Sequence, residues 1–150
     1  MGLMLDTNVF IHFERSDNPV DFSKWEKYGD VYISAITTSE LLVGVYYANT
    51  DTKRVRRSAF VESVLAKIPV LGFKTEEARV HAGLFATLSK QGQMIGAHDL
   101  IIAATAIVHN CAVLTENIKE FERVPGLETI SFIKGHGNEM GSGNRANLEL

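Results

Sequence analysis

Five short runs of apolar, β-branched and aromatic residues recur along the chain, and each has the length of a buried strand. They occupy residues 2–5, 30–34, 68–73, 111–115 and 127–133. The segments between them carry apolar residues at the spacing of amphipathic helices. These segments span residues 7–16, 19–28, 39–49, 52–68, 75–92, 97–110 and 117–124. Because short strands separated by helices pair in parallel and are covered by those helices, the pattern predicts an α/β fold.

The length of the chain, 150 residues, suits a single domain with one buried core. No linker interrupts the pattern before residue 134. Residues 134–150 differ in character, because they are polar, rich in glycine and poor in apolar side chains. We therefore expect a folded domain over residues 1–133 and a C-terminal tail over residues 134–150 that lacks fixed structure or depends on a partner.

Charge and cysteine content narrow the classes of function. Fifteen Lys and Arg residues stand against 18 Asp and Glu, and the formal net charge of −3 argues against broad electrostatic binding of nucleic acid. One basic patch, formed by Lys53, Arg54, Arg56 and Arg57, is either a solvated helix face or a contact for phosphate groups. The single cysteine, Cys111, excludes a disulfide within the chain and fits a reducing compartment. Since no segment has the pattern of a secretory signal or a membrane span, we expect a soluble cytoplasmic protein.

Four acidic residues lie at or near the beginning of a predicted helix. They are Asp6, Glu40, Asp99 and Glu120. Each can be explained as a helix cap, because acids at this position complement the helix dipole and its free N–H groups. Thr37-x-x-Glu40 has the spacing of a capping box, and Asn117-x-x-Glu120 has that of a looser one.

The same four acids also have a joint explanation. In a parallel sheet the strand-to-helix junctions lie on one edge, where ligand sites form, so Asp6, Glu40 and Glu120 are expected to meet there. Asp99, at a helix start, can join them. Carboxylates gathered in this way repel one another, and the only basic neighbour in sequence is Lys119, next to Glu120. Hard oxygen donors without a cysteine or histidine ligand set select Mg²⁺ or Mn²⁺. The chemistry that such a site favours is hydrolysis of a phosphodiester by a metal-activated water.

Four motifs in this order, LDTN, ITTSELLVGV, GAHDLIIAATA and LTENIKEFERVPGL, resemble the PIN-domain nucleases, and most closely the VapC-type toxins of bacterial toxin–antitoxin pairs. The resemblance extends from Leu3 to about Phe132. It implies a three-layer domain whose central parallel sheet is flanked by helices. It also implies an Mg²⁺- or Mn²⁺-dependent endoribonuclease, often a homodimer, that a VapB-type antitoxin holds inactive. The expected substrate is tRNA or ribosomal RNA, with a tRNA anticodon stem-loop as the specific guess.

The resemblance further implies roles for individual residues. Asp6, Glu40 and Asp99 would be the three principal metal-binding carboxylates. Thr7 or Asn8 would orient Asp6 or contact the phosphate.

The last motif departs from the usual family pattern. Many PIN domains carry an acid two residues after its threonine, Thr115, but here that position is Asn117. Glu120 resembles an alternative acidic position used in part of the VapC group, and it would bind metal directly or through water. Thr115 and Asn117 would support water or phosphate.

Two other functions remain open at this stage. An Asp6 nucleophile would make the chain a phosphohydrolase like the haloacid dehalogenases, although their second aspartate, two residues on, is Asn8 here. A PIN scaffold that binds RNA or protein without cutting is the other, and the retention of the three principal acids argues against it. His98, beside Asp99, could serve as a proton donor, but metal-assisted hydrolysis does not require one.

Overall fold

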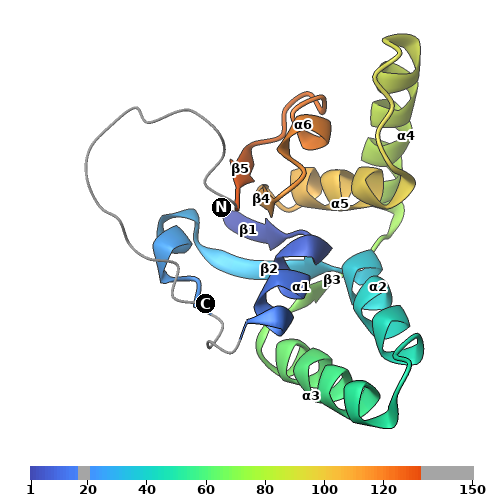
Figure 1. The fold of residues 1–150 in the computed structure, drawn as a ribbon. Coiled ribbons are helices and arrows are strands. Elements are labelled where there is room, and N and C mark those ends of the chain that lie inside the picture. Colours follow the sequence, from blue (N-terminus) through green and yellow to red (C-terminus); the bar gives the residue numbers. More distant parts are fainter. Residues whose placement is uncertain (17–20, 133–150) are drawn as a thin grey trace.

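Five strands, six α-helices and one 3₁₀ helix form the part of the chain that the structure, a computed structural model, describes, residues 1–16 and 21–132 (Figure 1). The strands are β1 (Gly2–Leu5), β2 (Asp30–Ser34), β3 (Val70–Leu71), β4 (Cys111–Thr115) and β5 (Thr129–Ser131). The helices are α1 (Thr7–Arg15), α2 (Ala35–Tyr46), α3 (Asp51–Lys67), α4 (Thr75–Lys90), α5 (Ala97–Val108) and α6 (Ile118–Phe121), with a 3₁₀ helix η1 (Ser23–Tyr28). The predicted tail over residues 134–150, and the first two residues of the helix predicted over 19–28, lie outside the described residues.

The strands form one sheet in the order β3-β2-β1-β4-β5, and every neighbouring pair is parallel. The chain runs outward from β1 to β3 on one side, then returns to place β4 and β5 on the other. The strand order therefore reverses beside β1, which is where open parallel sheets bind ligands. The predicted α/β fold with parallel pairing is confirmed.

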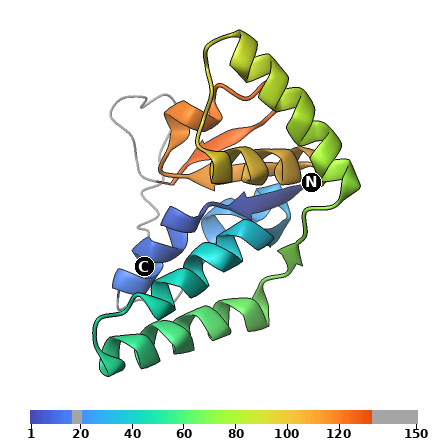
Figure 2. The same ribbon diagram turned by 90° about the vertical axis from the view of Figure 1, so that its right-hand side faces the viewer.

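Alternate residues of the central strands enter two separate hydrophobic clusters, one on each face of the sheet. Leu3 and Leu5 of β1 pack with side chains of α1 and α3, whereas Met4 packs with side chains of α4, α5 and α6. Figure 2 shows the resulting layers, with α4 and α5 on one side of the sheet and α1 and α3 on the other. The arrangement is the expected three-layer domain.

The alanine-rich helix α5 packs closely against the sheet. Ala103, Ala104 and Ala106 are fully buried, and their small side chains allow the helix backbone to approach the strands. The apolar character of α5 is thus explained by packing inside the domain. No helix among residues 1–16 and 21–132 is long and apolar enough to cross a membrane.

Two elements differ from their predicted bounds. Helix α2 begins at Ala35 rather than at residue 39, because the Ser34 hydroxyl accepts a hydrogen bond from the Ile36 N–H at 3.2 Å and caps the helix. Strand β3 covers only two of the six predicted residues. It lies at the edge of the sheet with a single neighbour, and it follows Pro69, which has no N–H to donate.

Candidate active site

The Asp6 carboxylate is fixed by two donors at the end of β1. Asp6 caps α1, because its Oδ1 accepts a hydrogen bond from the Thr7 N–H at 2.7 Å. Its Oδ2 accepts a second from the Thr115 hydroxyl at 2.7 Å. The side chain is only 4% exposed. Capping, one of the two explanations given by the sequence, is therefore correct for Asp6, but it uses only one of the two oxygens.

Thr115 orients Asp6 from the end of the neighbouring strand β4. The Asn117 N–H donates to Thr115 Oγ1 at 2.8 Å, so the single hydroxyl proton of Thr115 is free to point at Asp6. Since Thr115 is fully buried, water does not compete for this proton. Thr115 thus orients Asp6, a contact that the sequence did not predict, and its predicted support of water or phosphate stays a prediction.

Thr7 connects the first helix to the second acidic residue. Its hydroxyl lies 3.0 Å from Glu40 Oε1 and 3.3 Å from the hydroxyl of the buried Thr37. Thr37 and Glu40 are one helical turn apart inside α2, whose cap is Ser34. The capping box predicted from Thr37-x-x-Glu40 is therefore wrong, and Glu40 is free to face the end of β1.

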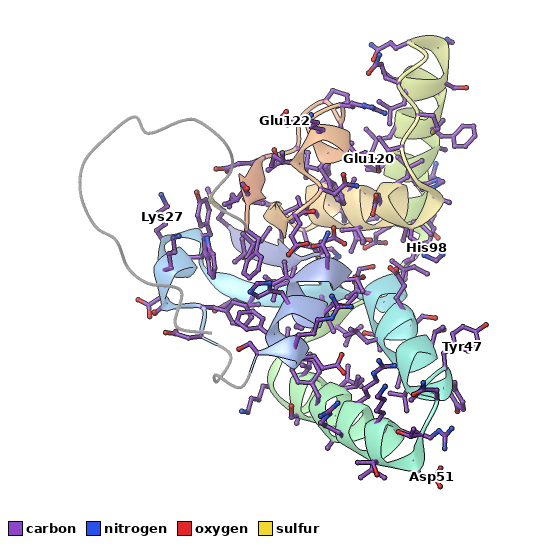
Figure 3. The ribbon with its side chains drawn as sticks, viewed as in Figure 1. Lys27, Tyr47, Asp51, His98, Glu120 and Glu122 are labelled. Carbon is purple, nitrogen blue, oxygen red and sulfur yellow. The ribbon has the colours of Figure 1, made fainter. Side chains whose placement is uncertain are left out.

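Asp99, Glu120 and Asn117 form a second hydrogen-bonded group beside the first. Asn117 Nδ2 donates to Asp99 Oδ2 at 3.3 Å. The carboxyl groups of Asp99 and Glu120 share a hydrogen bond, and the Gly96 N–H donates to Glu120. Glu120 thus reaches from α6 toward α5 (Figure 3). Asn117 makes no side-chain capping bond, so the looser capping box predicted over Asn117-x-x-Glu120 is also wrong.

Burial and the neighbouring negative charges raise the pKa of two of these acids, Asp6 and Asp99. Burial raises the pKa of Asp99 to about 7, together with the hydrogen bond that protonated Asp99 donates to Glu120 and the negative charges of Asp6, Glu120 and Glu40. Burial also raises the pKa of Asp6, against the hydrogen bonds from Thr115 and Thr7. The hydrogen bond from Asp99 lowers the pKa of Glu120, so the proton that the pair shares resides on Asp99. Asp99 therefore interacts electrostatically with each of the other three acids, and Asp6 interacts with Glu40 as well.

The donor set fits a hard divalent cation. Among the described residues, no lysine or arginine forms an ion pair with Asp6, Asp99 or Glu120. A Cβ added to Gly96 would lie 3.4 Å from Asp99 Oδ2 and 3.9 Å from Glu120 Oε2, so the missing side chain leaves space beside both oxygens. Among residues 1–16 and 21–132, no group of three or more Asp, Glu, His or Cys side chains is placed so that it could hold a metal ion by itself. That is compatible with Mg²⁺, which is usually held by one or two carboxylates, waters and substrate phosphates rather than by a protein cage.

Two other residues of interest lie at the margin of this group. Asn8 Oδ1 accepts a hydrogen bond from the Glu116 N–H at 3.3 Å and so ties α1 to the loop after β4. His98 Nδ1 lies 3.7 Å from Glu40 Oε1, and more than half of the His98 side chain is exposed. Asn8 is thus a support for the site, and His98 lies at its solvent edge.

Sequence reasoning assigned no role in the site to Gly96 or Thr37. Thr37 could have been found from its spacing, since a residue three positions before Glu40 lies on the same face of the helix as Glu40. Gly96 could have been found because it is a glycine at the start of a helix, three positions before Asp99. A glycine at such a position lets side chains such as Asp99 and Glu120 approach the backbone closely.

Comparisons with known proteins match most of this chain. A family model described as PIN domain matches residues 3–127. Ribonuclease VapC1 of Rickettsia felis is 43% identical over 131 residues, which make up 87% of this chain and 96% of that protein. The tRNA(fMet)-specific endonuclease VapC of Shigella flexneri is 34% identical over 133 residues, 86% of this chain and 96% of that protein. The match to the family model spans the positions of all four carboxylates of the site.

Solved structures share the fold. In the crystal structure of VapBC2 from Rickettsia felis bound to a DNA fragment from its promoter, one chain is 27% identical with a TM-score of 0.76. The match covers 89% of this chain and 100% of that chain. A chain of DNA-bound VapBC from Salmonella typhimurium is 29% identical with a TM-score of 0.76, and the match covers 87% of this chain and 98% of that one.

Proposed function

The chain belongs to the PIN-domain family and, within it, to the VapC ribonucleases, and from this premise we propose that it is an endoribonuclease toxin that requires Mg²⁺ or Mn²⁺. The observation that carries the metal requirement is the set of four carboxylates at one sheet edge, among which Asp99 has a pKa of about 7. An edge of this kind is unfavourable for the protein alone, because like charges repel. It becomes favourable when a divalent cation neutralises it.

Asp6, Glu40 and Asp99 would hold the cation, one or two of them directly and the rest through bound water, and Glu120 would hold it directly or through water. The bound ion would supply an activated water and neutralise charge on the phosphate and the leaving oxygen. The protein contributes orientation: Thr115 fixes Asp6, Thr7 fixes Glu40, and Asn117 fixes Asp99. Such supporting contacts keep carboxylates in one rotamer and so reduce the reorganisation that binding requires.

The partners follow from the relatives. The proposed inhibitor is a VapB-type antitoxin, because the matched crystal structures are VapBC assemblies. The proposed substrate is tRNA, because one relative is a tRNA(fMet)-specific endonuclease. We also propose a homodimer, as the resemblance implies, and light scattering of the purified chain would test it.

The chain lacks the second acid, two residues after Asp6, that the phosphohydrolase alternative needs. The residue two positions on is Asn8, whose Oδ1 is occupied by the Glu116 N–H. It offers no acid to protonate a leaving group.

Cleavage of total RNA tests the proposal. The protein, purified free of antitoxin, is incubated with total RNA in Mg²⁺, Mn²⁺ or EDTA, alongside Asp6→Asn and Asp30→Asn. Asp30 is a matched control because it is an exposed aspartate at the opposite end of the sheet, at the start of β2. We expect discrete cleavage by the wild type and Asp30→Asn in metal only, and a loss of at least a hundredfold in Asp6→Asn. Cleavage that persists in EDTA or in Asp6→Asn contradicts the metal mechanism, and no cleavage under any metal favours a non-catalytic scaffold.

A further inference from the structure

A cleft of about 470 Å³ opens between α1, α2 and α3, next to the acidic site. Figure 2 shows these three helices side by side below the sheet. The apolar side chains of the cleft are Ile11, Leu41 and Val61, one from each helix. One end of the cleft includes Thr7 and Glu40, so it is continuous with the acidic edge of the sheet. We name it the α1–α2–α3 cleft.

Four basic side chains line the same cleft. One of them is held by contacts within the fold, and the other three are exposed. Arg57 is already used by the fold, because its Nε lies 3.2 Å from Glu14 Oε1 and its Nη1 donates to the Gly44 carbonyl at 3.1 Å. Lys53 and Arg56 are exposed, and within the described residues their side chains have no ion pair and no hydrogen bond. Arg15, the fourth, is exposed as well. The fold thus provides unsatisfied positive charge on the rim of a cleft that ends at carboxylates.

We propose that the α1–α2–α3 cleft binds the part of the RNA strand that adjoins the scissile phosphodiester, with Lys53 and Arg56 contacting its phosphates. The inference rests on the proposed function, because it takes RNA as the substrate. It also decides between the two explanations that the sequence left open for the basic patch. Lys53 and Arg56 are phosphate contacts, Arg57 is a structural residue, and Arg54 is paired with Asp51 at 2.6 Å.

Charge complementarity favours RNA as the occupant. The chain as a whole is negative, so a polyanion can be attracted only where positive charge is concentrated. The cleft concentrates it beside the site where the phosphodiester would be cut. A strand whose scissile phosphate lies at Glu40 would continue over an apolar floor between these cations, which is the combination that single-strand sites use for bases and backbone.

The salt dependence of binding tests the inference. Affinity for a fluorescein-labelled single-stranded RNA of about twelve nucleotides is measured by anisotropy at several salt concentrations, in an Asp99→Asn background that prevents cleavage. The double variant Lys53→Ala/Arg56→Ala is compared with Arg79→Ala/Lys90→Ala. The control pair removes the same two charges from the exposed surface of α4. Thermal unfolding of each variant checks that the fold is retained.

We expect the Lys53→Ala/Arg56→Ala variant to bind the RNA at least about tenfold more weakly at low salt. The slope of log Kd against log salt should fall by about 1.4, since each lost single-strand phosphate contact removes about 0.7. The control should keep the wild-type slope. In the active enzyme the same pair should raise KM for RNA.

Three results would overturn the inference. The first is an unchanged slope of log Kd against log salt in the Lys53→Ala/Arg56→Ala variant while the wild type cleaves RNA. The proposed function would then stand without this inference. The second is an equal loss in the control pair, because the effect would then be one of total charge. The third is unchanged RNA binding combined with loss of inhibition by the antitoxin, which would assign the cleft to a protein. If the wild type neither binds nor cleaves RNA, the proposed function fails first.

Discussion

The hydrogen bond between Thr115 and Asp6 is the contact on which the orientation of the site depends most. It joins the ends of two neighbouring strands, and both residues are buried. Thr115→Val keeps the shape of the side chain but leaves Asp6 Oδ2 without its donor. We expect a decrease in kcat of about ten- to hundredfold, as for other groups that orient a metal-binding residue. We also expect a loss of about 1–3 kcal/mol in the free energy of unfolding.

Thr105→Val is the matched control for this substitution. Thr105 is also fully buried, and its hydroxyl donates to the Ile101 carbonyl inside α5 at 2.8 Å. Removing that hydroxyl should affect stability but not cleavage of RNA. Equal activity in the two variants would show that Thr115 has only a structural role.

At the residue scale, the sequence predicted positions better than contacts. Asp6 was placed at the correct sheet edge, because parallel topology alone brings strand-to-helix junctions together. Asp99 begins a helix that follows another helix, so this rule allowed it to join the edge but did not require it. The bond from Thr115 to Asp6 links residues 109 positions apart, and no local pattern encodes it. The capping box at Thr37 was wrong because Ser34, three residues earlier, provides the cap.

Among the elements, α5 and α4 are joined by a polar pair far from the acidic site. Glu77 of α4 is buried, and its oxygens accept hydrogen bonds from the Lys74 N–H and from His109 Nε2, each at 2.9 Å. His109 caps the end of α5 opposite Asp99. Glu77→Ala should therefore lower the free energy of unfolding by about 1–3 kcal/mol. Denaturant unfolding measures this.

Glu76→Ala is the control for Glu77→Ala, because Glu76 is the exposed neighbour in the same helical turn. We expect it to change stability by no more than about 0.5 kcal/mol. Backbone N–H donors lower the pKa of Glu77, so its stabilising effect is present above the usual glutamate pKa and is lost as the pH falls through the lowered value. Equal stability of the two variants would contradict this account.

The lengths of the elements were predicted best where burial is strongest. Strands β1 and β4, which are buried along their whole length, have their predicted bounds, since their apolar residues define them. Edge strands β3 and β5 are shorter than predicted, because a single neighbour supports fewer ladder bonds. Helix α2 begins earlier than predicted, because its first turn consists of Ala, Ile and Thr residues that do not show helical periodicity.

The whole molecule carries an electrostatic cost at the acidic edge, and this cost depends on pH. In the folded metal-free chain the pKa of Asp99 is about 7 against an ordinary value of 3.8. Between these values the folded state binds more protons than the unfolded state, so the contribution of Asp99 to stability decreases as the pH rises toward and through 7. In EDTA, Asp99→Asn should therefore be more stable than the wild type at pH 8, and the difference should shrink at pH 5.5. A difference that is constant across this range would contradict the assignment.

At this scale the sequence predicted the class of fold and its parallel pairing, but not the order of strands. The order β3-β2-β1-β4-β5 depends on which helices cover which face, and that follows from packing between distant segments. The order also explains the site, because it puts β1, which Asp6 follows, next to β4, which ends at Thr115.

Binding of Mn²⁺ to the metal-free protein, measured by isothermal titration calorimetry at pH 8, tests the central claim most directly. Wild type is compared with Glu120→Gln, Asp99→Asn and the control Glu122→Gln, whose exposed side chain points away from α5 (Figure 3). We predict that the wild type and Glu122→Gln bind Mn²⁺ with the same affinity, that Asp99→Asn binds at least about tenfold more weakly, and that Glu120→Gln lies between them. Equal affinity in Asp99→Asn and Glu122→Gln, or RNA cleavage by a protein that binds no Mn²⁺, would contradict the claim that the acidic edge is the metal site.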